Sequence, residues 1–143
     1  MLISLLRTPS RHATRSFRKV WETMPFNAKC GFTVEAWAAD AVTMRGPFLD
    51  ENTNGAGTMH GGFISSLIDS VATAVVIAGA ERGDRRNPVT TSLTVHYLGA
   101  ASSAVLATAT CSRRGKAMCF VDIAVTDETG RPIATAMVST LLR

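Results

Sequence analysis

One stretch of the chain combines glycine, histidine and a carboxylate at spacings that could support catalysis. Two adjacent glycines at the start of an apolar run let a ligand approach the backbone without a Cβ in the way. The free N–H groups of a helix's first turn, aided by the helix dipole, can stabilise a developing oxyanion, which is what acyl transfer requires. Glycines that allow close packing at a helix entry explain the same pattern equally well. The residues concerned are Asn54, Gly57, His60, Gly61, Gly62 and, after six more residues, Asp69.

Asp69 favours the chemical interpretation. It is the only ionisable residue between His60 and Glu81, and its neighbours are largely apolar. Burying a carboxylate without partners costs several kcal/mol, so such a residue needs a partner or a function. We expect a general base or a nucleophile, with a structural hydrogen bond to a strand or a neighbouring subunit as the alternative.

The spacing between Gly61 and Asp69 predicts an assembly. Eight residues of helix place them ~12 Å apart along the axis. At that distance, one substrate carbonyl cannot both accept a hydrogen bond from the Gly61 N–H and be attacked by Asp69 of the same chain. A second subunit that brings its own Asp69 to this helix N-terminus would complete the site, so we predict a site shared across a dimer.

The helix that carries these residues is predicted to run from Gly61 to about Ala80. At ~30 Å it is long enough for a membrane span, but a membrane-centre aspartate costs ~3 kcal/mol. The better prediction is a central helix surrounded by the protein's own sheet. Its polar residues are Ser65, Ser66, Asp69, Ser70 and Thr73.

Short apolar segments separated by turn residues predict a sheet around this helix, giving an α+β fold. With 143 residues, the chain has room for one such domain. Only 18% of the residues are charged, which suggests that another copy of the chain buries part of the surface. Three cysteines without a CxxC pair indicate free thiols. The expected strands are 31–37, 41–48, 89–98, 104–113, 117–126 and 132–142.

The N-terminal residues 1–24 form a basic arm ahead of the domain, which we place at 25–143. Five basic residues precede the first acid, Glu22, leaving ten basic against eleven acidic residues in the rest, a net charge of −1. The domain therefore has no basic face of the kind that binds nucleic acid. Thr8 and Pro9 predict the start of an amphipathic helix whose apolar residues are Phe17, Val20, Trp21 and Met24, with arginines opposite. We expect a cytoplasmic protein, or a mitochondrial matrix protein if the arm is a presequence.

The motif Asn54-x-x-Gly57-x-x-His60-Gly61-Gly62, followed by Asp69, resembles that of the hotdog-fold acyl-CoA thioesterases. The branch it is most similar to is the phenylacetyl-CoA-type group, related to 4-hydroxybenzoyl-CoA thioesterase. Thr90 at the start of the next strand and the closing Gly130-Arg131-Pro132 hairpin extend the resemblance from about Pro25 to Arg143.

This resemblance implies a hotdog fold and a role for each residue of the motif. Asp69 would activate water or attack the thioester, and Gly61 of the opposite subunit would donate its N–H to the thioester oxygen. Asn54 and Thr90 would position the carbonyl and the water, and His60 would shape the oxyanion end of the site. The resemblance also implies a homodimer, or a tetramer built as a dimer of dimers, acting on acyl-CoA without a cofactor.

Coenzyme A needs cations for its phosphates, and one turn supplies a dense cluster of them. Arg113, Arg114, Gly115 and Lys116 lie between two predicted strands, where a solvated hairpin turn is the alternative interpretation. The family often carries an Arg-Pro pair where this chain has Gly99-Ala100. No metal is expected, because the three histidines show no ligand spacing with each other or with the cysteines.

Two other functions compete with thioester hydrolysis. A hotdog-fold enoyl-CoA hydratase or dehydratase would use His60 and Asp69 as an acid/base pair. A non-catalytic acyl-CoA binding module could have kept the motif without the chemistry. Release of free thiol from acyl-CoA distinguishes the hydrolase from both, and the unbroken pattern from Asn54 to Asp69 favours hydrolysis.

Overall fold

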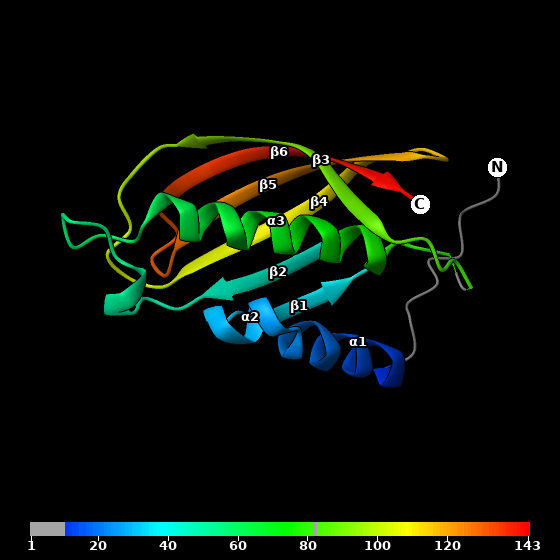
Figure 1. Ribbon diagram of the computed structural model, residues 1–143, viewed down its shortest axis with the longest axis horizontal. Helices are drawn as coiled ribbons and strands as arrows, with labels where there is room; N and C mark the ends of the chain where they lie inside the picture. The colour runs from blue at the N-terminus through cyan, green and yellow to red at the C-terminus, as the bar shows by residue number, and fades with distance from the viewer. Residues whose placement is uncertain (1–10, 82) are drawn as a thin grey trace.

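The structure is a six-stranded antiparallel sheet curled around one long helix, α3 (Gly61–Ala78), as Figure 1 shows. This computed structural model describes residues 11–81 and 83–143, so the helix start predicted at Thr8 and Pro9 lies outside the described residues. The strand order is β1-β2-β4-β5-β6-β3. The predicted α+β fold is confirmed, and every strand begins and ends within two residues of its prediction. The strands are β1 (Thr33–Ala38), β2 (Ala41–Gly46), β3 (Pro88–Tyr97), β4 (Val105–Arg114), β5 (Met118–Asp127) and β6 (Pro132–Leu142).

Helix α3 is apolar because it is the centre of the core. In the described part of the chain it is the one helix long and apolar enough to cross a membrane, and here it packs on the sheet. The predicted sheet around a central helix is confirmed, but the sheet does not enclose the helix completely. Gly62 and Asp69 are exposed, because the sheet stops at β3 and no described element covers α3 beyond that edge. Its buried residues are Phe63, Ile64, Leu67, Ile68, Ser70, Val71, Ala72, Ala74, Val75 and Val76.

The two edges of the sheet differ in what covers them. Helix α1 (Arg11–Thr23) lies along β1 (Figure 1). The Arg18 guanidinium donates to the carbonyls of Val34 and Glu35, and the Glu22 carboxylate accepts from the Val34 N–H at 2.7 Å. These bonds occupy backbone groups that another strand would otherwise pair with. Edge β3 pairs only with β6 in the described chain, so its other side is open.

The apolar stripe predicted for the N-terminal arm packs only in part. Trp21 is buried, but Phe17, Val20 and Met24 are 50%, 58% and 42% exposed. Arg18 bonds to β1 and therefore faces the domain, not the opposite side as predicted. A helix can present only one side to a sheet edge, and here Trp21 and Arg18 share that side.

Two short helices escaped prediction: α2 (Pro25–Cys30) and the 3-10 turn η1 (Asp50–Asn52). Helix α2 matters because it ties the N-terminal helices to α3. Ser70 donates to Asn27 Oδ1 at 2.8 Å, and Asn27 Nδ2 donates to the Trp21 carbonyl at 2.9 Å. Both side chains are buried, so this network fixes the helix one residue beyond Asp69.

Candidate active site

A partly exposed stripe of α3 faces the open side of the β3 edge. Gly61, Ser65 and Asp69 follow one another at four-residue spacing, which places them on one side of the helix. Strand β3 runs beside this stripe, with Thr90 hydrogen-bonded to Asp69 and Tyr97 hydrogen-bonded to Gly61 and Ser65. The two ends of the candidate site therefore lie on one surface, ~12 Å apart along the helix axis.

Asp69 is held by Thr90, a contact that the sequence analysis did not predict. The Thr90 hydroxyl donates to Asp69 Oδ1 at 2.6 Å, a short charge-assisted bond. Thr90 lies where the register of β3 shifts against β6, between Thr90 and Ser92. Among the residues that the structure describes, nothing bonds to Asp69 Oδ2. One carboxylate oxygen is thus oriented by the protein, and the other is available for chemistry.

The N-terminus of α3 has one free backbone donor. His60 is the N-cap, and its Nδ1 accepts from the Gly62 N–H at 2.9 Å. This contact assigns the ring proton of neutral His60 to Nε2. The N–H groups of Phe63 and Ile64 donate to the His60 carbonyl. The Gly61 N–H has no acceptor within the described residues, so of the first four it alone is available to a ligand.

Asn54 is engaged inside its own loop. Its Oδ1 accepts from the N–H groups of Ala56 and Thr58 at 2.9 and 3.2 Å, and its Nδ2 donates to Thr58 Oγ1 at 3.0 Å. Gly57 takes the left-handed conformation, φ 74°, that this tight turn requires. None of these bonds reaches α3. In the single chain Asn54 therefore shapes the loop that leads into His60.

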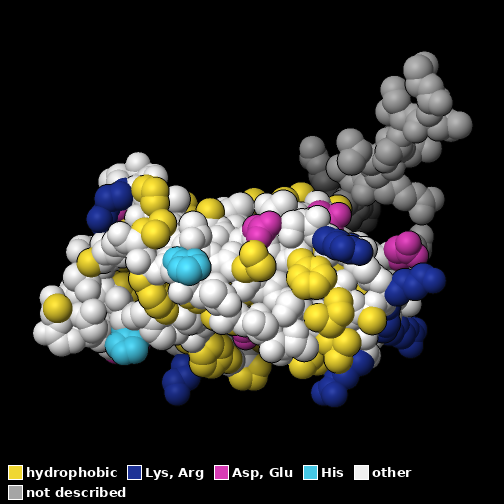
Figure 2. Space-filling view, turned by 90° about the horizontal axis from the view of Figure 1, so that it is seen from above, with side chains coloured by type: hydrophobic (Ala, Val, Ile, Leu, Met, Phe, Trp, Pro, Cys, Tyr) yellow, Lys and Arg dark blue, Asp and Glu magenta, His cyan; other side chains and the backbone are white. Residues whose placement is uncertain are grey.

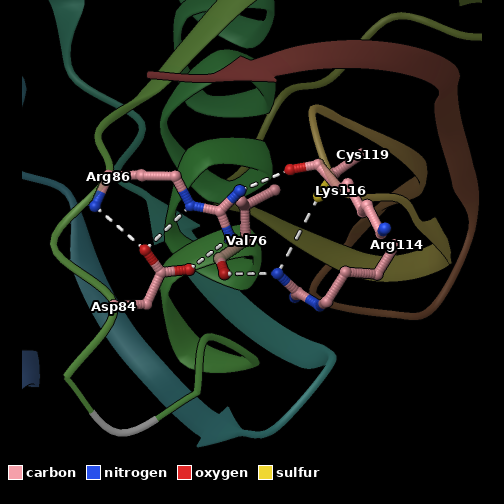
Figure 3. A network of polar contacts seen from close by, with 6 residues as sticks. All are labelled: Val76, Asp84, Arg86, Arg114, Lys116 and Cys119. Carbon is pink, nitrogen blue, oxygen red and sulfur yellow. Dashed lines mark hydrogen bonds and ion pairs between the residues drawn. The ribbon is translucent and has the colours of Figure 1, made fainter.

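Arg114, predicted to bind phosphate, is instead bonded to the protein. Its guanidinium donates to the Val76 carbonyl at 3.0 Å (Figure 3), which places a cation at the negative end of the helix dipole, and it pairs with Asp40 at 2.8 Å. A Cβ at Gly79 would overlap the ends of both the Asp40 and the Arg114 side chains, so a larger residue there would displace this pair. Contact between Arg114 and a phosphate would require breaking these bonds.

Arg114→Met should therefore destabilise the protein. Removing the guanidinium leaves Asp40 and the Val76 carbonyl without their partner, and we expect the free energy of unfolding to fall by about 1–2 kcal/mol. Urea unfolding followed by circular dichroism measures this. Arg113→Met is the matched control, because Arg113 is exposed and bonds to none of the described residues. Equal losses in the two variants would contradict the assignment.

The remaining cations gather where α3 ends. Figure 2 shows several Lys and Arg side chains at this end of the molecule. Arg86, which sequence analysis missed, pairs with Asp84 at 2.7 Å and also donates to the Lys116 carbonyl (Figure 3). Hydrogen bonds from Arg86 lower the pKa of Asp84 to about 2, so this pair stays ionised and contributes no net charge. In the described chain Arg113 and Lys116 have no ion-pair partner. A separate cavity of about 190 Å³ at this end of α3 is lined in part by Arg85, Arg86 and Arg114.

The fold and this surface together define the class of protein. The family model of the thioesterase superfamily matches residues 56–134, and the chain belongs to that superfamily. Among curated proteins it is similar to acyl-coenzyme A thioesterase 13 from human and from mouse, at 30% identity over 86 residues. That segment covers 59% of this chain and 61% of each relative, so the match spans less than two thirds of their length.

Solved structures confirm the predicted hotdog fold. Thioesterase superfamily member 2 from Mus musculus superposes with a TM-score of 0.81, at 24% identity, covering 92% of this chain and 98% of that one. A thioesterase from Haemophilus influenzae gives a TM-score of 0.82, at 16% identity, covering 91% and 90%. A hypothetical thioesterase from Streptococcus pneumoniae, solved with coenzyme A, gives 0.71, at 22% identity, covering 78% and 85%. The phenylacetyl-CoA-type branch stays a prediction.

Proposed function

We propose that this protein hydrolyses acyl-CoA thioesters, so that thioester and water give a carboxylic acid and the free thiol of coenzyme A. The observation that carries the proposal is the presence of two groups on one partly exposed face. Within residues 11–81 and 83–143, one carboxylate oxygen of Asp69 and the N–H of Gly61, at the start of the same helix, have no hydrogen-bond partner. Membership of the thioesterase superfamily and the similarity to acyl-CoA thioesterases support it.

The complete site would form between two copies of the chain. Since α1 blocks β1, the open edge is β3, and pairing of two β3 strands would continue the sheet into the partner. An antiparallel arrangement brings the partly exposed stripes of the two α3 helices together. With the two-fold axis near Ser65, midway between Gly61 and Asp69, each Asp69 would lie opposite the partner subunit's Gly61. Two such dimers would form the expected tetramer.

In this site the charge that develops on the thioester oxygen is stabilised by the Gly61 N–H and the positive end of α3. Asp69, oriented by Thr90, either takes a proton from water or attacks the thioester carbon itself. His60 caps the turn that presents Gly61. A single turnover in ¹⁸O-water separates the two routes. A general base puts the label into the first acid released. A nucleophile forms an Asp69–acyl anhydride with loss of the coenzyme A thiolate, and water attack on the Asp69 carbonyl of this anhydride gives an unlabelled first acid and leaves the label on Asp69.

Coenzyme A would extend from Asp69 toward the C-terminal end of α3. Ala78 lies nine residues beyond Asp69, ~14 Å along the axis, a span that suits an extended pantetheine arm. The exposed cations Arg113 and Lys116 at that end would meet its phosphates. The coenzyme A in the Streptococcus pneumoniae structure supports this class of ligand.

Arg113→Ala combined with Lys116→Ala should raise KM for acyl-CoA about five- to tenfold and leave kcat nearly unchanged. Exposed phosphate contacts contribute equally to ground-state and transition-state binding. A truncated pantetheine thioester, which lacks the nucleotide phosphates, should be hydrolysed as by the wild type. The control is Arg45→Ala, an exposed arginine paired with Glu128. Equal losses on both substrates would place coenzyme A elsewhere.

The function itself is tested by a thiol-trapping dye with aryl, short, medium and long acyl-CoAs. Steady-state thiol release from at least one of them supports the proposal and reports the preferred acyl group. Saturable acyl-CoA binding without release would indicate a binding module. Hydration of an enoyl-CoA without thiol release would indicate a hydratase.

A further inference from the structure

Tyr97, the only tyrosine of the chain, stands over the first turn of α3. Its hydroxyl donates to the Gly61 carbonyl at 2.8 Å and lies 2.5 Å from the Ser65 hydroxyl. A Cβ built on Gly61 would lie 3.2 Å from Tyr97 Cζ, so the ring covers the glycine backbone directly. Neither Tyr97 nor Ser65 belongs to the sequence motif that identifies the site.

The first turn of α3 has little else to hold it. Gly61 and Gly62 carry no side chains that could pack, and glycine is the residue that loses most conformational freedom when it is ordered. Two contacts compensate for this. The His60 ring caps the Gly62 N–H, and Tyr97 binds the Gly61 carbonyl. The Gly61–Gly62 peptide is therefore hydrogen-bonded at both its carbonyl oxygen and its N–H group.

The direction of the hydrogen bonds follows from counting protons. A phenol has one proton, and Tyr97 donates it to the Gly61 carbonyl, so Ser65 must donate to the Tyr97 oxygen. Ser66 differs, because its hydroxyl donates to the Gly62 carbonyl of its own helix at 2.8 Å. Donors in series polarise one another, so Ser65 strengthens the bond that Tyr97 makes.

We propose that Tyr97 is a positioning residue for the oxyanion-binding turn, and that Ser65 acts through Tyr97. This inference rests on the proposed function. By fixing Gly61, Tyr97 holds the one free N–H of the turn where charge develops on the thioester oxygen. A donor positioned in advance acts mainly in the transition state, and a small displacement is costly. Tyr97 is 52% exposed in the single chain, at the edge where we expect the partner to bind.

The test is a double-mutant cycle. Tyr97→Phe keeps the ring and deletes the hydroxyl, and should lower kcat roughly three- to tenfold with KM little changed. Ser65→Ala should lower kcat by less. The double variant should equal Tyr97→Phe, because Ser65 has no route to Gly61 without the phenol oxygen. Ser66→Ala is the matched control and should behave as wild type.

Two further measurements do not depend on activity. Incorporation of 3-fluorotyrosine gives a single ¹⁹F signal, which Ser65→Ala should shift and Ser66→Ala should not. Amide hydrogen exchange should become faster in the first turn of α3 in Tyr97→Phe, with the rest of the helix protected as before. Gel filtration must show unchanged assembly, since Tyr97 lies at the open edge.

Additive effects of the two substitutions would mean that Ser65 does not act through Tyr97, and would overturn that part of the proposal. A change confined to KM, or unchanged exchange at the first turn, would overturn the positioning role. A wild-type protein that releases no thiol from any acyl-CoA would refute the proposed function instead. The ¹⁹F shift and the exchange rates would then still decide whether Tyr97 fixes the turn.

Discussion

Asp69→Asn should remove most thioester hydrolysis while the fold and assembly stay intact. The amide keeps the shape of the carboxylate and can still accept the Thr90 hydrogen bond, but it can neither take a proton from water nor attack a thioester. We expect kcat/KM to fall at least ~100-fold, since general-base catalysis contributes that much or more. Because Asp69 is exposed in the single chain, the substitution leaves no buried group unsatisfied.

Thr90→Val provides the graded comparison for this experiment. It removes only the hydroxyl that orients Asp69 Oδ1, so the loss should be a few-fold, close to the value of one hydrogen bond. Thr90→Ser should restore activity. Near wild-type turnover by a folded Asp69→Asn protein would refute the assignment of Asp69. Parallel circular dichroism and gel filtration show whether a loss of activity is a loss of structure.

The sequence predicted the strands and the central helix well because both are local patterns. Apolar residues at helical spacing after His60 mark α3, and alternating segments with Gly or Asp-Glu turns mark the strands. The family resemblance named Asp69 and Thr90 as site positions, but the hydrogen bond between them is seen only in the structure.

The exposure of Asp69 could not be predicted from the sequence in the same way. The hydropathy pattern predicts that α3 is a core helix, but it does not predict which edge strand of the sheet remains unpaired. The strand order leaves β3 at that edge, and so in the stripe on α3 Asp69 is exposed and Gly61 and Ser65 are half-buried in one chain. The four-residue spacing of this stripe is a signal that could have revealed it.

Polar contacts between residues far apart in the sequence were the other feature that could not be predicted. Arg114 stands in a run of cations that is typical of a solvated turn or a phosphate site, and only the fold shows that it caps α3 and pairs with Asp40, 74 residues away in sequence. Tyr97 meets Gly61 across 36 residues. Such contacts depend on which strand ends lie beside which end of the helix. Local sequence patterns do not contain this information.

Gly61→Pro should remove most of the activity, because proline has no backbone N–H to donate to the thioester oxygen. Gly61 is the first residue of α3, where proline fits because its N–H is not needed by the helix. The preceding residue, His60, has φ −65° and ψ 133°, an extended conformation that is compatible with a following proline. Loss of one oxyanion-hole donor should lower kcat about 100- to 1,000-fold.

Gly61→Ala is the matched control for this substitution. It adds a Cβ at the same place, 3.2 Å from the Tyr97 ring, but keeps the N–H. The alanine variant should therefore lose only a few-fold in kcat, the share that crowding against Tyr97 accounts for. If alanine and proline were equally damaging, the N–H would not be the group that matters.

The two inactive variants together test whether the site is shared. In a heterodimer of a Gly61→Pro chain and an Asp69→Asn chain, one site carries both defects and the other carries neither. The intact site should work, so co-expressed and tandem-purified heterodimers should recover up to half of the wild-type activity, although each variant alone is inactive. This follows because ~12 Å of helix separates Gly61 from Asp69 in one chain, while the open β3 edge can bring the partner subunit's Gly61 to Asp69. Heterodimers that assemble but stay inactive, or an active monomer in gel filtration, would show that each chain carries its own complete site.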